Sequence, residues 1–350
     1  MWSVLVFVFL FVISASFSQE TTFCKCVNSY LCRKNGTIIT DGGGEFIITE
    51  RIKETCRCNC PNDLVCCRLE SGDMSIDPAQ PGSKCGFRNP DGTGFKIGAN
   101  GEGANFGEFP WMMGILTESG GYRCGGSLIH PSVVLTAAHC VVSKSTYIVR
   151  AGEWDSSNTK EILKHQDRTV SSKKIHEDYI PGIYHNDIAL LFLNEPFKLD
   201  SHINVTCLPP SNASFENVRC VATGWGKDKF GSTGKYDPLL KKIELPLVQR
   251  NTCQENLRAT RLRRYFYLHP SFLCAGGEKD KDACIGDGGG PLVCPINGQE
   301  NKYYQIGVVS WGIECGQENV PAVYSNIPFL RQWIDKQMQD KNLDISVYQY

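Results

Sequence analysis

Three short motifs hold the residues of this chain that could do chemistry together. His139 lies in LTAAHC, Asp187 lies in HNDIALL, and Gly288 lies at the centre of CIGDGGGP. A histidine oriented by an aspartate can act as the base that activates a hydroxyl or thiol for acyl transfer. Gly288 offers neither group, and its nearest reactive neighbours are Asp287 and Cys284. The chain therefore carries a base and an orienting carboxylate without an evident nucleophile.

The elements that must position these motifs are short strands. From about Ile97 onward, runs rich in Val, Ile, Leu and Tyr alternate with Gly and Pro, as in SVVLTAAH, TYIVRAGEW, DIALLFL and YYQIGVVSW. This spacing predicts an all-β sandwich or barrel. One helix is expected over about 328–338, because apolar residues recur there at helical spacing and Pro328 suits the first turn.

The three motifs in this order resemble the active site of the trypsin-like serine peptidases, which have a chymotrypsin-like double β-barrel. The likeness covers roughly residues 97–340 and extends to GEFPWM, RCGGSLI, GWG, SWG and PAVYSNI. It implies that His139 matches the base, Asp187 the orienting residue and Gly288 the nucleophile position. A domain of this kind forms no acyl-enzyme, so the resemblance implies an inactive peptidase in which the histidine and aspartate remain as a hydrogen-bonded pair.

The substrate pocket and activation strand depart from trypsin in part. Asp282 matches the aspartate that gives trypsin its preference for basic residues, and Gly312 belongs to the SWG motif. Glu314 and Ala322 stand where trypsin has glycines, so their side chains are expected to obstruct substrate entry. Lys96 occupies the usual activation cleavage site, but the IGAN that follows it differs from the usual sequence. Activation by cleavage there is therefore not expected to be the switch.

Cysteine content and the N-terminus indicate secretion. The 350 residues include 18 cysteines, an even number that predicts nine disulfides in an oxidising compartment. An apolar run with small residues after it predicts a signal peptide over 1–18 and no membrane anchor. The formal charge of -1 gives no reason to expect nucleic-acid binding. Three sequons are candidate glycosylation sites: Asn35, Asn204 and Asn212.

The likeness to trypsin also implies how the ten cysteines from Cys85 onward pair. The implied disulfides are Cys85–Cys207, Cys124–Cys140, Cys220–Cys294, Cys253–Cys274 and Cys284–Cys315.

The N-terminal part is predicted to be a separate small domain. Eight cysteines fall within 24–67, and a polar stretch rich in Pro and Gly over 68–96 predicts a linker. The cysteine pattern resembles an arthropod clip domain, although such domains usually have six cysteines, which leaves the connectivity open.

A clip domain followed by a protease domain with glycine in place of serine resembles the clip-domain serine protease homologues of insects, in particular the prophenoloxidase-activating factors. This resemblance implies a haemolymph protein of innate immunity that acts by binding. The implied partners are phenoloxidase or prophenoloxidase and an activating clip-domain protease. It also implies regulation by limited proteolysis, for which Arg51 in ITERIKE is the favoured site, and possible homo-oligomer formation after cleavage.

Two further features could bind partners or ions. The stretch AGEWD at 151–155 begins a loop that holds calcium in some relatives. Glu153, with Glu161 or Asp167, could supply oxygen ligands for Ca²⁺ there. An insertion between Cys253 and Cys274 contains several arginines and aromatic residues, which suggests either a docking surface for an acidic partner or an ordinary solvated loop or short helix.

Two alternative functions remain open on the sequence. One is a microbial-surface recognition protein. The other is an active trypsin-like peptidase, if Gly288 is a sequence variant.

Overall fold

The computed structural model describes residues 24–28, 64–68, 85–93, 103–157, 161, 163–226, 238–279, 287–313 and 316–350. The chain divides into two compact units, of which the first holds most of the N-terminal 75 residues. Its described part is an antiparallel pair of strands, β1 (Cys24–Asn28) and β2 (Leu64–Arg68). The predicted signal peptide and the residue Arg51 lie outside the described residues.

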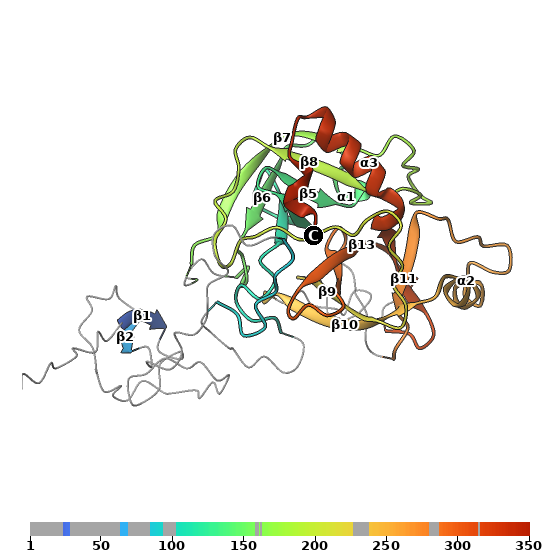
Figure 1. Cartoon of the computed structure of the whole chain (residues 1–350), viewed down its shortest axis with the longest axis horizontal. Coiled ribbons are helices and arrows are strands. Elements are labelled where there is room, and N and C mark those ends of the chain that lie inside the picture. Colours follow the sequence, from blue (N-terminus) through green and yellow to red (C-terminus); the bar gives the residue numbers. More distant parts are fainter. Residues whose placement is uncertain are drawn as a thin grey trace, which may run out of the picture. The chain divides into compact units, whose positions relative to one another are not determined.

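The second unit contains two closed six-stranded antiparallel barrels, which confirms the predicted chymotrypsin-like fold (Figure 1). The first barrel has the strand order β3-β4-β5-β8-β7-β6 and the second has β10-β11-β14-β13-β12-β9. The first consists of β3 (Met112–Thr117), β4 (Tyr122–His130), β5 (Val133–Thr136), β6 (Tyr147–Ala151), β7 (Gln166–Ile175) and β8 (Ala189–Leu193). The second consists of β9 (Arg219–Gly224), β10 (Lys241–Val248), β11 (Phe272–Gly276), β12 (Pro291–Pro295), β13 (Tyr303–Trp311) and β14 (Pro321–Asn326).

Helices are few. Short α1 (Ala138–Val141) follows β5, α2 (Arg250–Arg258) follows β10, and α3 (Ile327–Asp340) follows β14. The 3₁₀ turn η2 (Ile345–Tyr348) follows α3. The expected helix over 328–338 is confirmed as α3, and α2 includes the first residues of the insertion after Cys253, for which a short helix was one alternative. Within the described segments, no helix has the length and apolarity needed to cross a membrane.

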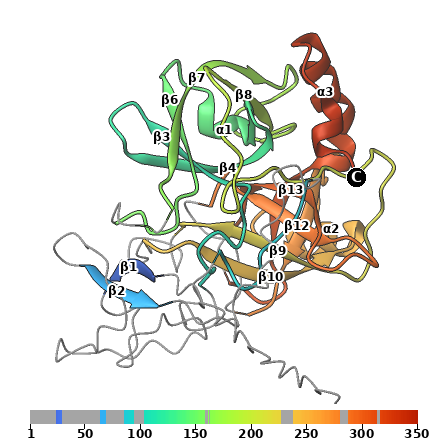
Figure 2. The ribbon, with the colours of Figure 1, turned by 60° about the vertical axis from the view of Figure 1, so that its left-hand side comes forward.

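Helix α3 connects the two barrels. It continues directly from β14 of the second barrel, yet Leu330, Ile334 and Met338 are buried in the apolar core of the first. Figure 2 shows α3 beside the first barrel, with the second barrel below. Burial of three large apolar side chains contributes several kcal/mol, so this helix fixes how the barrels meet.

Residues 85–93 pack on the barrel domain, although the sequence suggested a solvated linker over all of 68–96. Cys85 forms a disulfide with Cys207. Arg88 donates a hydrogen bond of 2.6 Å to the fully buried carboxylate of Glu108, which Lys242 also contacts at 2.9 Å. A buried carboxylate needs such cationic partners, so they hold this segment in place.

Candidate functional site

His139 and Asp187 meet because their strands are neighbours. His139 lies on α1, just after the end of β5, and Asp187 lies just before β8. Strands β5 and β8 pair antiparallel, with Thr136 opposite Ala189, so the residues beyond these ends come together. The Nδ1 atom of His139 lies 2.7 Å from Oδ2 of Asp187, and the backbone N–H of His139 donates to Oδ1 at 2.8 Å.

The second barrel completes the shell around Asp187, which is fully buried. Ser310 on β13 donates its hydroxyl to Oδ2 of Asp187 at 2.6 Å, and Ser325 on β14 donates to the backbone carbonyl of Asp187 at 2.6 Å. Burial raises the pKa of Tyr179 to about 12, and the negative charge of the Asp187 carboxylate adds to this effect. The aspartate is therefore a structural junction between the barrels. Neither serine was predicted at the site from the sequence, although Ser310 begins the SWG motif.

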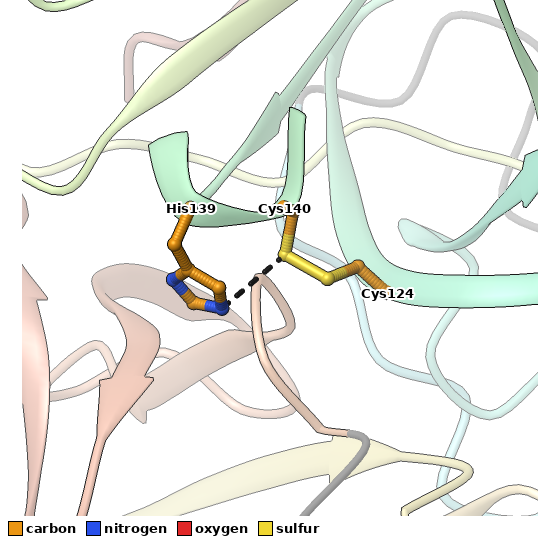
Figure 3. A group of neighbouring side chains, drawn as sticks. All are labelled: Cys124, His139 and Cys140. Carbon is orange, nitrogen blue, oxygen red and sulfur yellow. Dashed lines mark hydrogen bonds between the residues drawn. A yellow bond between two sulfur atoms is a disulfide. The ribbon is translucent and has the colours of Figure 1, made fainter. Parts of the chain in front are cut away.

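Position 288, opposite the His139 ring, has no reactive side chain. A Cβ atom built on Gly288 would lie 2.9 Å from Nε2 of His139, closer than real Cβ contacts allow. Instead, Nε2 lies 3.5 Å from Sγ of Cys140, and Figure 3 shows the ring edge turned toward the disulfide of Cys140 with Cys124. These two sulfurs are bonded to each other, so Cys124 and Cys140 supply no thiolate that could bind a metal ion together with His139.

The loop around Gly288 is held by the backbone. The carbonyl of Gly288 accepts a hydrogen bond from the N–H of Gly125 at 2.9 Å, and the N–H of Gly289 donates to Val309 at 2.9 Å. Gly289 has φ of +80°, and a Cβ there would meet the side chain of Thr136, so glycine is required. Gly288 is not among the residues with positive φ.

The GWG motif accommodates Asp287. Its Oδ1 accepts a hydrogen bond from the N–H of Gly226 at 2.8 Å, and a Cβ on Gly224 or Gly226 would collide with its carboxylate. The two glycines therefore make room for the partly buried carboxylate of Asp287, which is what the motif contributes here.

Tyr184 flanks the remnant site and was not singled out from the sequence. Its ring meets the ring of His139 edge to face, with 5.8 Å between centroids. Its φ of 60° is unusual for a residue with a side chain. The conformation holds an aromatic ring beside the base, which narrows access to that side of the histidine.

The predicted pocket residues are described only in part. Gly312 is exposed, and among the described residues a Cβ there would meet no atom within 4 Å. Ala322 is buried on β14, opposite Ala275 of β11, in the apolar core of the second barrel. Asp282, Glu314 and Lys96 lie outside the described residues.

Four disulfides are formed in the described barrels: Cys85–Cys207, Cys124–Cys140, Cys220–Cys294 and Cys253–Cys274. They are four of the five pairs that the likeness to trypsin implies. The fifth, Cys284–Cys315, lies outside the described residues.

The candidate calcium residues separate into two groups. Ligand atoms of Glu153, Glu161 and His165 lie within 4.8 Å of one another. Asp167 is instead held by Arg150 through two hydrogen bonds, of 2.8 and 2.9 Å. Burial acts to raise the pKa of Asp167, but the two hydrogen bonds from Arg150 keep this pKa below its usual value. The structure therefore groups His165, not Asp167, with the two glutamates.

The glutamate pair is electrostatically unfavourable as it stands. Burial, and then the neighbouring Glu153, raise the pKa of Glu161 to about 8. Its Oε1 accepts hydrogen bonds from the N–H groups of Trp154 and Asp155, at 2.6 and 2.9 Å, while Oε2 is buried without a hydrogen-bond partner among the described residues. A buried carboxylate oxygen beside a second carboxylate suits a divalent cation with oxygen ligands.

Two antiparallel barrels with a histidine and an aspartate at their junction define a trypsin-like domain. The family model described as Trypsin matches residues 99–334. Phenoloxidase-activating factor 2 of Galleria mellonella is 51% identical over 76% of this chain and 92% of its own length. Inactive CLIP domain-containing serine protease A28 of Anopheles gambiae is 36% identical over 92% of this chain and 90% of its own. Phenoloxidase-activating factor 1 of Holotrichia diomphalia is 33% identical over 78% and 80%. The chain belongs to the clip-domain serine protease homologues.

Replacement of Asp187 by alanine is expected to destabilise the domain strongly. It would leave the Ser310 hydroxyl and the N–H groups of His139 without their acceptor, at about 2–4 kcal/mol in total. Thermal unfolding followed by circular dichroism should show a fall in Tm of roughly 4–16 °C. His139→Ala is the matched control, because its ring is partly exposed and Asp187 keeps its bond to Ser310. An equal loss in both variants would contradict a mainly structural role for the aspartate.

Proposed function

We propose that this chain is a secreted, non-catalytic cofactor of prophenoloxidase activation in the haemolymph. The observation that carries the proposal is the glycine at position 288, which leaves a formed His139–Asp187 pair with no nucleophile to activate. A trypsin-like domain without that hydroxyl retains its surface loops, and loops on a rigid scaffold serve recognition. The names of two relatives, phenoloxidase-activating factors, favour this pathway over microbial-surface recognition.

In this role the protein would hold phenoloxidase or prophenoloxidase together with an activating clip-domain protease, and it would self-associate after it has been cut. The test is reconstitution. Prophenoloxidase and the activating protease are mixed with and without the purified, pre-cleaved chain, and oxidation of a catechol substrate is followed. Strong phenoloxidase activity only when the chain is present supports the proposal. Equal activity without it, or binding to microbial polysaccharide alone, contradicts it.

Limited proteolysis at Arg51 is expected to switch the cofactor on. This residue lies outside the described residues and is chosen from the sequence, as a basic residue in the long stretch between Cys32 and Cys56. Arg51→Gln should resist the upstream protease and should abolish phenoloxidase activation in the reconstituted system. Lys96→Gln is the matched control and should be cut and act as the wild type does. If the two variants behave in the opposite way, the switch lies at the activation strand instead.

We further propose that Glu153 and Glu161 hold a calcium ion. Glu153 has a cationic partner in Arg150, at 3.1 Å, and calcium would supply further positive charge between Glu153 and Glu161. His165 lies beside the two carboxylates as a further group. With the dissociation constants of extracellular modules, about 5 mM Ca²⁺ would stabilise the fold by about 1–2 kcal/mol. Differential scanning fluorimetry should then show Tm higher in Ca²⁺ than in EDTA by roughly 2–8 °C, and Mg²⁺ should have a smaller effect.

The calcium effect should also grow with pH. The folded pKa of Glu161, about 8, lies above the ordinary value, so in EDTA its contribution to stability is present in acid and lost as pH rises toward about 8. Ca²⁺ should therefore raise Tm more at pH 8 than at pH 6. Glu161→Gln should remove the response, whereas Glu195→Gln, the same substitution at an exposed site, should keep it. A response retained by Glu161→Gln would place the ion elsewhere.

A further inference from the structure

The connection from α2 to β11 presents an exposed group of arginine and tyrosine side chains. This loop forms the right-hand edge of the barrel domain in Figure 1. Tyr265 is 82% exposed and Tyr267 is 62% exposed, which is uncommon for large aromatic residues. Arg261, Arg263 and Arg264 beside them are exposed as well. We call these five residues the Arg–Tyr surface.

The loop that carries the Arg–Tyr surface is held by many contacts. Arg258 at the end of α2 donates to the carbonyl of Phe266 at 2.8 Å, and Gln254 accepts from the N–H of Leu268 at 3.0 Å. The ring of Phe266 packs edge to face on Trp311, with 6.1 Å between centroids. A loop fixed in this way loses little conformational entropy when a partner binds, so its exposed side chains are available at low cost.

The electrostatics of the surface are one-sided. The stretch 250–267 contains five arginines and a single acidic residue, Glu255, in a chain whose formal charge is -1. Glu255 pairs with Arg258 at 2.8 Å, and within the described part of the chain neither Arg261 nor Arg263 has an ion-pair partner. Arg264 stacks on Tyr265, with 4.7 Å from its guanidinium carbon to the ring centroid. A concentrated positive charge without internal partners attracts an acidic ligand.

Apolar side chains continue the surface past His269. The ring of His269 stacks on that of His185 with 4.1 Å between centroids, which brings the segment before Asp187 next to the loop. Ile180 and Ile183 in that segment are about half exposed, and Phe329 at the start of α3, also half exposed, meets the His269 ring edge to face. An acidic ligand alone would leave these apolar groups in water.

From these observations we infer that the Arg–Tyr surface is a docking site for a partner protein, which it binds through a polypeptide segment that mixes acidic and apolar residues. Arginine and tyrosine are the residue types that dominate binding energy at protein interfaces. The positive charge would steer such a segment in, while the exposed tyrosines and isoleucines would take its apolar side chains. This inference deepens the proposed function and rests on it in one respect: a chain without a nucleophile acts by binding.

The test uses the full-length chain and a short fluorescein-labelled peptide that alternates glutamate with phenylalanine and leucine. Fluorescence anisotropy should show binding that weakens as NaCl is added, and a matched peptide with glutamine for every glutamate should bind much more weakly. Arg261→Glu with Arg263→Glu, and separately Tyr265→Ala with Tyr267→Ala, should each lower the affinity roughly tenfold or more. The double variant Lys144→Glu with Lys198→Glu makes the same change of charge at exposed positions of the first barrel and should alter it less than about twofold.

A charge exchange makes the test specific. The arginine-reversed variant should bind a peptide with lysine in place of each glutamate better than the wild type does, and its unchanged Tm would show that the fold is intact. Equal binding of the acidic peptide by wild type and both surface variants overturns the inference. So does binding of a heparin fragment that competes with the peptide and is insensitive to the tyrosine substitutions, because the site would then serve polyanions.

The readout also separates this inference from the proposed function. If the wild-type chain does not raise phenoloxidase activity in the reconstituted system but still binds the peptide through the Arg–Tyr surface, only the proposed function is contradicted. If the wild-type chain raises phenoloxidase activity but substitutions in the Arg–Tyr surface leave peptide binding unchanged, only the inference is contradicted.

Discussion

The purified chain, whether intact or cut, is expected to hydrolyse Arg and Lys peptide substrates on the order of a million-fold more slowly than an active trypsin-like peptidase. That factor is the cost of removing the nucleophilic serine in a serine peptidase of a different fold. Here the base and its orienting carboxylate are formed, with 2.7 Å between Nδ1 of His139 and Oδ2 of Asp187. Position 288 offers His139 no hydroxyl, because Gly288 ends at its Cα, and Nε2 of His139 lies 3.5 Å from the disulfide sulfur of Cys140.

The measurement combines release of p-nitroaniline from Arg and Lys substrates with labelling by a fluorophosphonate probe, and trypsin serves as the positive control. No turnover above buffer and no label on the pure protein are expected. Since trace contamination by an active peptidase can mimic turnover, the labelled fraction decides. Stoichiometric label would show that another residue had taken the place of the nucleophile, and the proposed non-catalytic role would then fail.

The likeness to the trypsin-like peptidases implied the double barrel and the pair of His139 with Asp187, whereas the residue pattern by itself predicted only short strands in a sandwich or barrel. Short apolar runs between Gly and Pro residues define strands locally, and the motifs around His139 and Asp187 place each residue at a strand end. Neighbouring strands that pair antiparallel then bring those ends together without further information.

Ser310, Ser325 and Tyr184 could not be assigned to the site in the same way. The two serines reach Asp187 from strands of the other barrel, at sequence separations of 123 and 138 residues. Such contacts depend on how the barrels pack, which local patterns do not report. Tyr184 reaches His139 through a positive φ that a residue with a side chain rarely adopts, so no propensity would have indicated it.

The composition of the segment 85–93 does not predict that this segment packs on the barrel domain. Its Pro and Gly content fits a solvated linker, and a single arginine looks like a surface charge. The structure instead places Arg88 against the buried carboxylate of Glu108, and the requirement to neutralise that carboxylate decides where the segment lies.

The space next to His139 determines what a restored serine would meet. A Cβ on Gly288 would lie 2.9 Å from Nε2 and 3.4 Å from Cε1 of His139. The ring cannot retreat freely, because Asp187 holds both its Nδ1 and its backbone N–H. The backbone at Gly288 has no positive φ, so serine fits the turn, and the obstacle is the position of the ring. A shift of a few tenths of an ångström in the ring weakens its bond to Asp187 or misaligns it for proton transfer.

Gly288→Ser is therefore expected to restore at most feeble turnover of Arg or Lys substrates, and none without cleavage after Lys96. Gly288→Ala is the matched control, since it adds the same Cβ beside His139 without a hydroxyl, and the two variants should lose similar stability in thermal unfolding. The difference between the two variants in p-nitroaniline release and in fluorophosphonate labelling then measures the effect of the serine hydroxyl alone. Ala322, buried in the second barrel where trypsin has a glycine, remains unchanged in both variants. Vigorous trypsin-like turnover by the uncut serine variant would show that the missing hydroxyl was the only defect, and that the ring of His139 moves aside more easily than its bonds to Asp187 indicate.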